Sequence, residues 1–192
     1  MKNLILSLSF VLVSVFNLSA KEMPTLANTY GENILGLDLS KWNASKVNVR
    51  LTDELGQVLV TENFDMGVKK IRLYNLKNLS DGNYSLKVED DQKIATQAVE
   101  ITNGVVLANE NISYVYKPNV KVQGTSVKLN LLSLGNKVTV SILDKENTLV
   151  YEDKMGVQNS VAKQYNLMNL PSGKYTILVE SGVNTVSKEI NF

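Results

Sequence analysis

The sequence contains neither cysteine nor histidine among its 192 residues. Without cysteine it can form no disulfide, zinc–thiolate site or thiol nucleophile. Without histidine it can hold neither a Ser-His-Asp triad nor an imidazole metal ligand. Basic and acidic side chains nearly balance, 20 to 19, so no excess charge favours nucleic acid or an anionic membrane as a partner. Because 44% of the residues are hydrophobic, the composition is that of a folded protein and not of a disordered one.

Long hydrophobic runs are also scarce, and the one at the N-terminus is short. Lys2 precedes a mainly apolar stretch over residues 4–16, and charge resumes at Lys21 after the small residue Ala20. This layout is typical of a secretory signal peptide, whereas a membrane anchor needs roughly 20 apolar residues. We therefore expect residues 1–20 to direct export, and the mature chain to be periplasmic, cell-surface or extracellular, with no transmembrane segment.

The chain after residue 20 contains one pattern twice. Residues 47–101 align without a gap with residues 138–192, at a constant offset of 91 (138 minus 47). Identical residues meet in this alignment at turn and strand positions, among them Asp53 with Asp144, Tyr74 with Tyr165, Asn75 with Asn166, Leu76 with Leu167 and Gly82 with Gly173. We interpret the repeat as two copies of one domain, at residues 21–102 and 103–192.

Each copy reads as a series of short strands. Apolar and polar residues alternate over 47–51 and 84–88, and again over 138–142 and 175–179, which is the period of a half-buried strand. Further strands are predicted near residues 34–39, 58–64, 68–74, 93–101, 112–116, 127–134, 149–154, 160–165 and 185–192. The sequence therefore predicts an all-β fold of two tandem Ig-like antiparallel β-sandwich domains after an N-terminal signal peptide.

A Leu-x-x-Gly-x-Tyr motif occurs once in each copy. In Ig-like sandwiches such a motif forms a tyrosine corner, in which the tyrosine hydroxyl bonds back to the backbone of the preceding turn. We therefore predict a structural and not a catalytic role for its six residues, Leu79, Gly82 and Tyr84 in the first copy and Leu170, Gly173 and Tyr175 in the second.

The second copy resembles the C-terminal sorting domains of the Bacteroidetes type IX secretion system. The resemblance lies in a strand ending at Asp144, the segment Leu149-Val-Tyr-Glu152, the strand that follows Leu170-Pro-Ser-Gly-Lys-Tyr175, and the terminal Ser187-Lys-Glu-Ile190. It covers residues 138–192 and, more weakly, the first copy. It implies a small Ig-like sandwich, a secreted origin, and a sorting role for the second domain.

Few residues are candidates for binding. Trp42, the only tryptophan, stands between two predicted strands, where an exposed ring could stack on a sugar and a buried ring would cap the first core. The acidic run Glu89-Asp90-Asp91 follows a strand, and it could belong to a calcium loop or to a solvated hairpin turn. The second copy has Glu180-Ser181-Gly182 at the equivalent place, which favours the turn.

The sequence thus predicts an exported, non-catalytic protein with a structural, adhesive or protein-binding role. We assign no catalytic, cofactor-binding or metal-binding residue. The expected partner is a protein or a cell-surface component, with a glycan as an alternative, and the oligomeric state stays open. The alternatives are a type IX cargo with a C-terminal sorting signal, a carbohydrate-binding module centred on Trp42, and a hydrolase with two convergent carboxylates.

Overall fold

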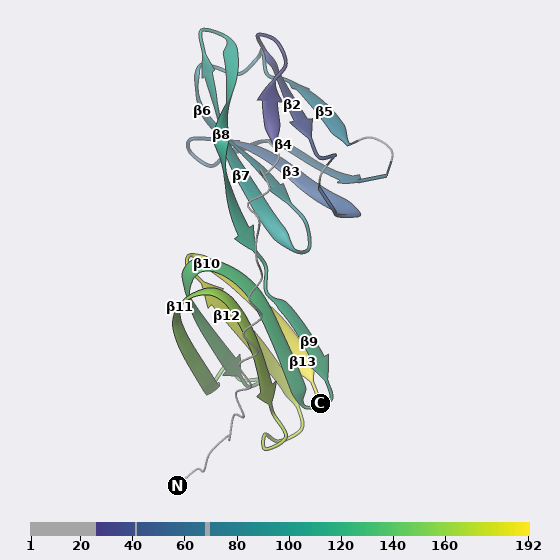
Figure 1. The fold of residues 1–192 in the computed structure, drawn as a ribbon, viewed down its shortest axis with the longest axis vertical. Coiled ribbons are helices and arrows are strands. Elements are labelled where there is room, and N and C mark those ends of the chain that lie inside the picture. Colours follow the sequence, from purple (N-terminus) through teal and green to yellow (C-terminus); the bar gives the residue numbers. More distant parts are fainter. Residues whose placement is uncertain (1–25, 41, 68–69) are drawn as a thin grey trace. The chain divides into compact units, whose positions relative to one another are not determined.

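The computed structural model describes residues 26–40, 42–67 and 70–192, and all regular structure in these ranges is β-strand (Figure 1). The described chain forms two compact units, which divide between Val115 and Tyr116. We call them the first unit and the second unit. The expected signal peptide, residues 1–20, lies outside the described residues. Within those residues, no helix has the length and hydropathy needed to cross a membrane.

The first unit is a sandwich of two antiparallel sheets. One sheet has the order β1-β2-β5, and the other has the order β4-β3-β6-β7-β8. The strands are β1 (Ala27–Thr29), β2 (Ile34–Asp38), β3 (Lys46–Asp53), β4 (Val58–Asp65), β5 (Ile71–Asn75), β6 (Gly82–Glu89), β7 (Lys93–Thr102) and β8 (Val105–Tyr116). Alternate side chains from both sheets, such as Leu37, Val49 and Val88, form one buried core. This is the Ig-like arrangement that the sequence predicts.

The strand β8 places the domain boundary later than the sequence suggests. The repeat put the boundary between residues 102 and 103, but β8 extends the sheet beyond β7, so the compact division follows Val115. Sequence alternation indicated a strand only over residues 112–116. The earlier part of β8 does not alternate, since three apolar residues at 105–107 are followed by mostly polar ones.

The second unit is built around one long hairpin (Figure 1). Its strands are β9 (Asn119–Gln123), β10 (Ser126–Leu143), β11 (Leu149–Asn166), β12 (Lys174–Ser181) and β13 (Asn184–Asn191). The order is β11-β10-β12-β13, and β9 pairs with the first part of β10. Side chains from both halves of β10, including Val127 and Val140, share one core.

The strands β10 and β11 are continuous where the sequence predicts two shorter strands in each. The register of their pairing shifts between Leu132 and Asn136 and again beside Gly156. Leu134, Gly135 and Gly156 have positive φ values of 51°, 82° and 68°. Such irregularities bend a strand without ending its pairing. The strand β10 therefore corresponds to β2 and β3 of the first unit, and β11 corresponds to β4 and β5.

Both units make the same turn, after β3 in the first unit and after β10 in the second. The Oδ1 atoms of Asp53 and Asp144 each accept hydrogen bonds from the backbone N–H groups two and four residues further on. Gly56 and Asn147 close these turns at φ values of 79° and 60°, a left-handed conformation that glycine and asparagine tolerate. The alignment places both aspartates at turn positions, and the structure confirms this in both copies.

Candidate functional site

The two motif tyrosines make the same hydrogen bond. The Tyr84 hydroxyl donates to the backbone carbonyl of Ser80 at 2.6 Å, and the Tyr175 hydroxyl donates to that of Pro171 at 2.8 Å. Each acceptor lies four residues before its tyrosine. Each bond therefore fastens the start of a strand to the turn that leads into it, which is the geometry of a tyrosine corner.

The leucine and glycine of the motif belong to the same turn. Leu79 and Leu170 pack against the two cores, and each donates its N–H to the carbonyl of the leucine three residues earlier at 2.9 Å. Gly82 begins β6, and Gly173 immediately precedes β12. All these contacts are internal to a sandwich.

Trp42 is buried, with 7% of its surface exposed. Its indole Nε1 donates to Asp90 Oδ2 at 2.7 Å, and Lys93 Nζ lies 4.2 Å from the ring centre. The hydrogen bond satisfies the polar end of the ring, and the ammonium lies over the ring as in a cation–π contact. This burial contradicts the hypothesis that Trp42 stacks on a sugar, because the ring already caps the first core.

The acidic run after β6 closes a hairpin. Asp90 Oδ1 accepts from the N–H groups of Gln92 and Lys93 at 2.6 and 2.7 Å, while its other oxygen holds Trp42. Asp90 is buried, so the expectation of a solvated turn is wrong at this residue. In the part of the chain that the structure describes, no three His, Cys, Asp or Glu side chains lie close enough to hold a metal ion.

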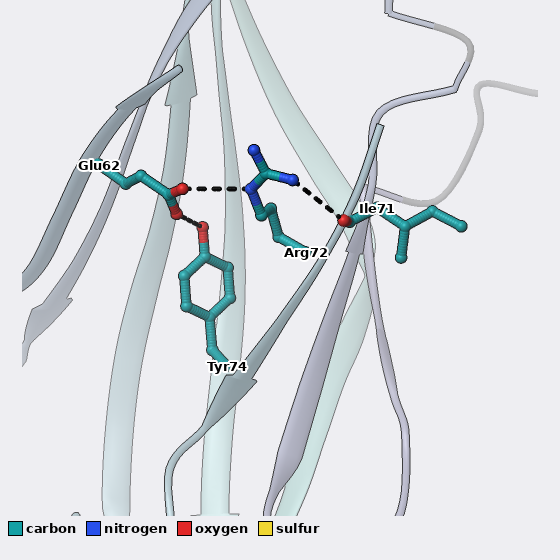
Figure 2. A network of polar contacts seen from close by, with 4 residues as sticks. All are labelled: Glu62, Ile71, Arg72 and Tyr74. Atoms are coloured by element: carbon teal, nitrogen blue, oxygen red, sulfur yellow. Dashed lines mark hydrogen bonds and ion pairs between the residues drawn. The ribbon is translucent and has the colours of Figure 1, made fainter. Parts of the chain in front are cut away.

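Sequence reasoning missed a polar network that spans the two sheets of the first unit. Glu62 lies on β4, and Arg72 and Tyr74 lie on β5, at the edges of different sheets. The Arg72 Nε atom lies 3.1 Å from one Glu62 carboxylate oxygen, and the Tyr74 hydroxyl donates to the other at 2.9 Å (Figure 2). Arg72 also donates to the carbonyl of Ile71. The carboxylate thus joins two side chains of the opposite sheet.

The second unit repeats this network at the same offset of 91 residues. Asp153, Lys163 and Tyr165 replace Glu62, Arg72 and Tyr74. The Tyr165 hydroxyl donates to Asp153 Oδ2 at 3.2 Å, and Lys163 Nζ lies 3.4 Å from the same oxygen. We call each set of three an acid–base–tyrosine clasp. The alignment itself carried the signal, because an acid, a base and a tyrosine recur at matching positions.

The clasps keep their tyrosines protonated. Burial, and then the hydrogen bond to Glu62, raise the pKa of Tyr74 well above its ordinary value. Burial, followed by the charge of Asp153 and the hydrogen bond to it, raises the pKa of Tyr165 in the same way. A tyrosine with a raised pKa donates a hydrogen bond and is a poor base at neutral pH. The clasps are therefore suited to holding strands together.

Comparison with protein families assigns the chain to a family. A family model described as the secretion system C-terminal sorting domain matches residues 31–102 and 115–191, one match in each unit and well over half of the chain in total. The chain belongs to this sorting-domain family. Membership in the family of type IX sorting domains implies a secreted protein, as the sequence resemblance suggested. The strand β8 lies mostly between the two matches. A search of curated proteins gave no match.

Three solved structures resemble this sorting-domain protein distantly. The BSP domain of a biofilm-associated protein aligns with 86% of the chain at 14% identity and a TM-score of 0.28. A tetra-tandem repeat from the extending region of a large adhesion protein aligns with 85% at 15% identity and 0.26. A β-glucuronidase from Ruminococcus gnavus aligns with 88% at 15% identity and 0.28. The matches span 28%, 46% and 40% of those chains, and at these scores they carry no functional argument.

Proposed function

We propose that this protein is a non-catalytic cargo of type IX secretion, delivered to the cell surface or the medium, whose second unit carries the sorting signal. The observation behind the proposal is the family match over residues 115–191, which covers nearly the whole of the second unit. The first unit matches the same family, and we assign it a structural, adhesive or protein-binding role. We expect it to act through sheet faces and strand edges.

The use of the acidic side chains supports a non-catalytic role. Asp53, Asp81, Asp90 and Asp144 each accept hydrogen bonds from backbone N–H groups in turns. Glu62 and Asp153 are engaged in the two clasps. Acids committed to turns and clasps serve the fold, and a pair of hydrolytic carboxylates would instead have to face one substrate.

The sorting role can be tested by secretion of a reporter. A fluorescent protein behind a signal peptide is fused to residues 116–192 or, as the matched control, to residues 26–115. Both fusions are expressed in a type IX-competent host and in the same host lacking the secretion system. We expect the second-unit fusion to reach the surface or the medium only in the competent host, and the first-unit fusion to stay in the periplasm.

Two results would count against the proposal. Retention of the second-unit fusion in the periplasm of the competent host would remove its sorting role. Release of both fusions from the strain without the secretion system would show that export does not depend on it. Protease accessibility on intact cells distinguishes surface display from periplasmic retention.

A further inference from the structure

The outer face of the β1-β2-β5 sheet exposes an apolar group. Tyr30 is 55% exposed, Ile71 52% and Leu73 59%. On β5, Ile71 and Leu73 alternate with the clasp residues Arg72 and Tyr74. Because side chains alternate along a strand, Ile71 and Leu73 lie on the face opposite to the clasp. Large apolar side chains grouped on a sheet face mark a surface that meets a partner or ligand more often than scattered ones do.

The ring of Tyr30 covers the backbone of Gly36 in the middle of β2. A Cβ atom on Gly36 would collide with the Cδ2 and Cε2 atoms of this ring, so the contact requires glycine. Gly36 pairs with Leu73 across the strands, and directly paired residues project to the same face. The Tyr30 ring therefore lies against the backbone of Gly36 on the same face as Leu73, and 55% of the residue is exposed.

Polar side chains surround this centre. Asn28 pairs with Gly36, Asp38 pairs with Ile71, and Asn75 pairs with Ile34. All three are exposed, and the two-residue period of a strand places them on the outer face. Asp38 Oδ1 accepts from the Ser40 N–H at 2.8 Å, and Asn75 Oδ1 accepts from the Lys77 N–H at 3.1 Å, so both side chains are fixed at the rim of the face. The face thus combines an aromatic ring with amide and carboxylate groups. Amides and carboxylates can exchange hydrogen bonds with hydroxyl groups.

The equivalent face of the second unit is polar. Gln164 pairs with Lys128, and Lys128 pairs with Lys121, in the places of Leu73, Gly36 and Asn28. Gln164 also donates to the Ser126 hydroxyl at 2.9 Å. The same sandwich therefore forms with lysine and glutamine at these positions. The apolar centre of the first unit is not a requirement of the fold.

We propose that this face binds a neutral pyranose sugar, which stacks on Tyr30 while the surrounding polar groups bind its hydroxyls. The exposed apolar group is limited to Tyr30, Ile71 and Leu73, and its one aromatic ring offers a flat apolar surface on which a sugar ring can stack. None of these outward-facing strand residues is a lysine or an arginine that would bind an anionic sugar. This inference does not depend on the route of secretion, since it concerns the folded first unit.

Titration of the purified full chain, residues 21–192, with cellohexaose and maltohexaose tests the proposal by amide chemical shifts. We expect at least one sugar to shift amides of residues 28–38 and 71–75, with affinity in the millimolar to micromolar range. Tyr30→Ala should weaken that binding about tenfold or more, the loss of a stacked aromatic contact, and Tyr30→Phe should retain it. Leu73→Gln should also weaken it, because it installs the residue of the second unit.

Matched controls keep the test decisive. Gln123→Ala, on the equivalent edge of the second unit, should leave the binding unchanged. If Tyr30→Ala disturbs the amide spectrum of the free protein, Leu73→Gln, a substitution of an exposed residue, replaces it as the test variant. Absence of shifts with both sugars, or shifts that survive Tyr30→Ala and Leu73→Gln, overturns the proposal. Concentration-dependent dimerisation that both variants abolish would assign the face to a second copy and would also overturn it.

Discussion

The strand β7 of the first unit is covered by β8, whereas its counterpart β13 is the last strand of its sheet in the second unit. Gln97 on β7 is 1% exposed, and its amide bonds the backbone of Ala27 and Asn109. The equivalent Lys188 on β13 is exposed, and its Nζ donates to the carbonyl of Val120 at 3.0 Å. A covered edge carries a neutral amide, and an open edge carries a lysine, which discourages pairing with other strands.

The residues that stabilise each sandwich from within are equivalent in the two units. The turn aspartates, the tyrosine corners and the clasps occur in both units with equivalent partners. Their contacts lie inside a single sandwich, so they are needed whatever surrounds it. The outer face of the β1-β2-β5 sheet behaves in the opposite way, since its apolar centre has no equivalent in the second unit. Residues that are equivalent in the two copies therefore stabilise the fold, and residues that differ between the copies reflect the different surroundings of each unit.

The largest expected effect tests the contrast between the covered and the open edge. Gln97→Leu removes the hydrogen bonds that the amide makes with Ala27 N, Ala27 O and Asn109 O, and it leaves the buried backbone N–H and C=O of Ala27 without these partners. We expect a loss of roughly 3 kcal/mol or more in the free energy of unfolding, and a change within about 0.5 kcal/mol for Lys188→Leu. Denaturant unfolding followed by Trp42 fluorescence reports the first unit, and amide exchange reports the second.

An equal loss for the two variants would show that edge coverage does not explain the choice of residue. A second control, Gln97→Glu, keeps the size of the side chain but removes its donor. We expect it to be at least as destabilising as Gln97→Leu, because a carboxylate would be buried against two carbonyl oxygens.

A smaller effect tests the features that the units share. Tyr84→Phe and Tyr175→Phe each remove one hydroxyl-to-carbonyl hydrogen bond, and we expect each to lower the free energy of unfolding of its own unit by about 1 kcal/mol. Amide exchange measured separately on the strands of the two units checks the values. Unchanged stability of both variants would contradict the structural role of the motif. A loss of stability in one unit alone would show that the two copies of the motif do not contribute equally.

Features that depend on nearby residues could be predicted from the sequence, and features that depend on distant partners could not. The turn after Asp53 and the corner at Tyr84 close within four residues, so a local motif suffices to predict them. The burial of Trp42 depends on Asp90, which is 48 residues away. The covering of β7 by β8 and the continuity of β10 depend on pairing that no local pattern encodes. The clasps were visible in the repeat, but only at polar positions that a search for apolar alternation passes over.

The smallest expected effect concerns the clasps and appears at high pH. The pKa of Tyr74 and that of Tyr165 are raised above the ordinary value of 10.0 in the folded chain. Below pH 10 both tyrosines are protonated in the folded and unfolded states, and their contribution to stability is fully present. Above pH 10 the unfolded chain ionises first, so this contribution is lost as the pH rises through the raised values.

Tyr74→Phe and Tyr165→Phe should therefore cost less than about 1 kcal/mol at neutral pH but should flatten the decline in stability above pH 10. The slope of the unsubstituted protein, measured in the same buffers, is the control. Tyr74 joins strands of two separate sheets, whereas Tyr165 and Asp153 lie on the same strand, β11, so Tyr74→Phe should have the larger effect at neutral pH. The reverse order would mean that the continuous hairpin, and not the pair of separate sheets, depends more on its clasp.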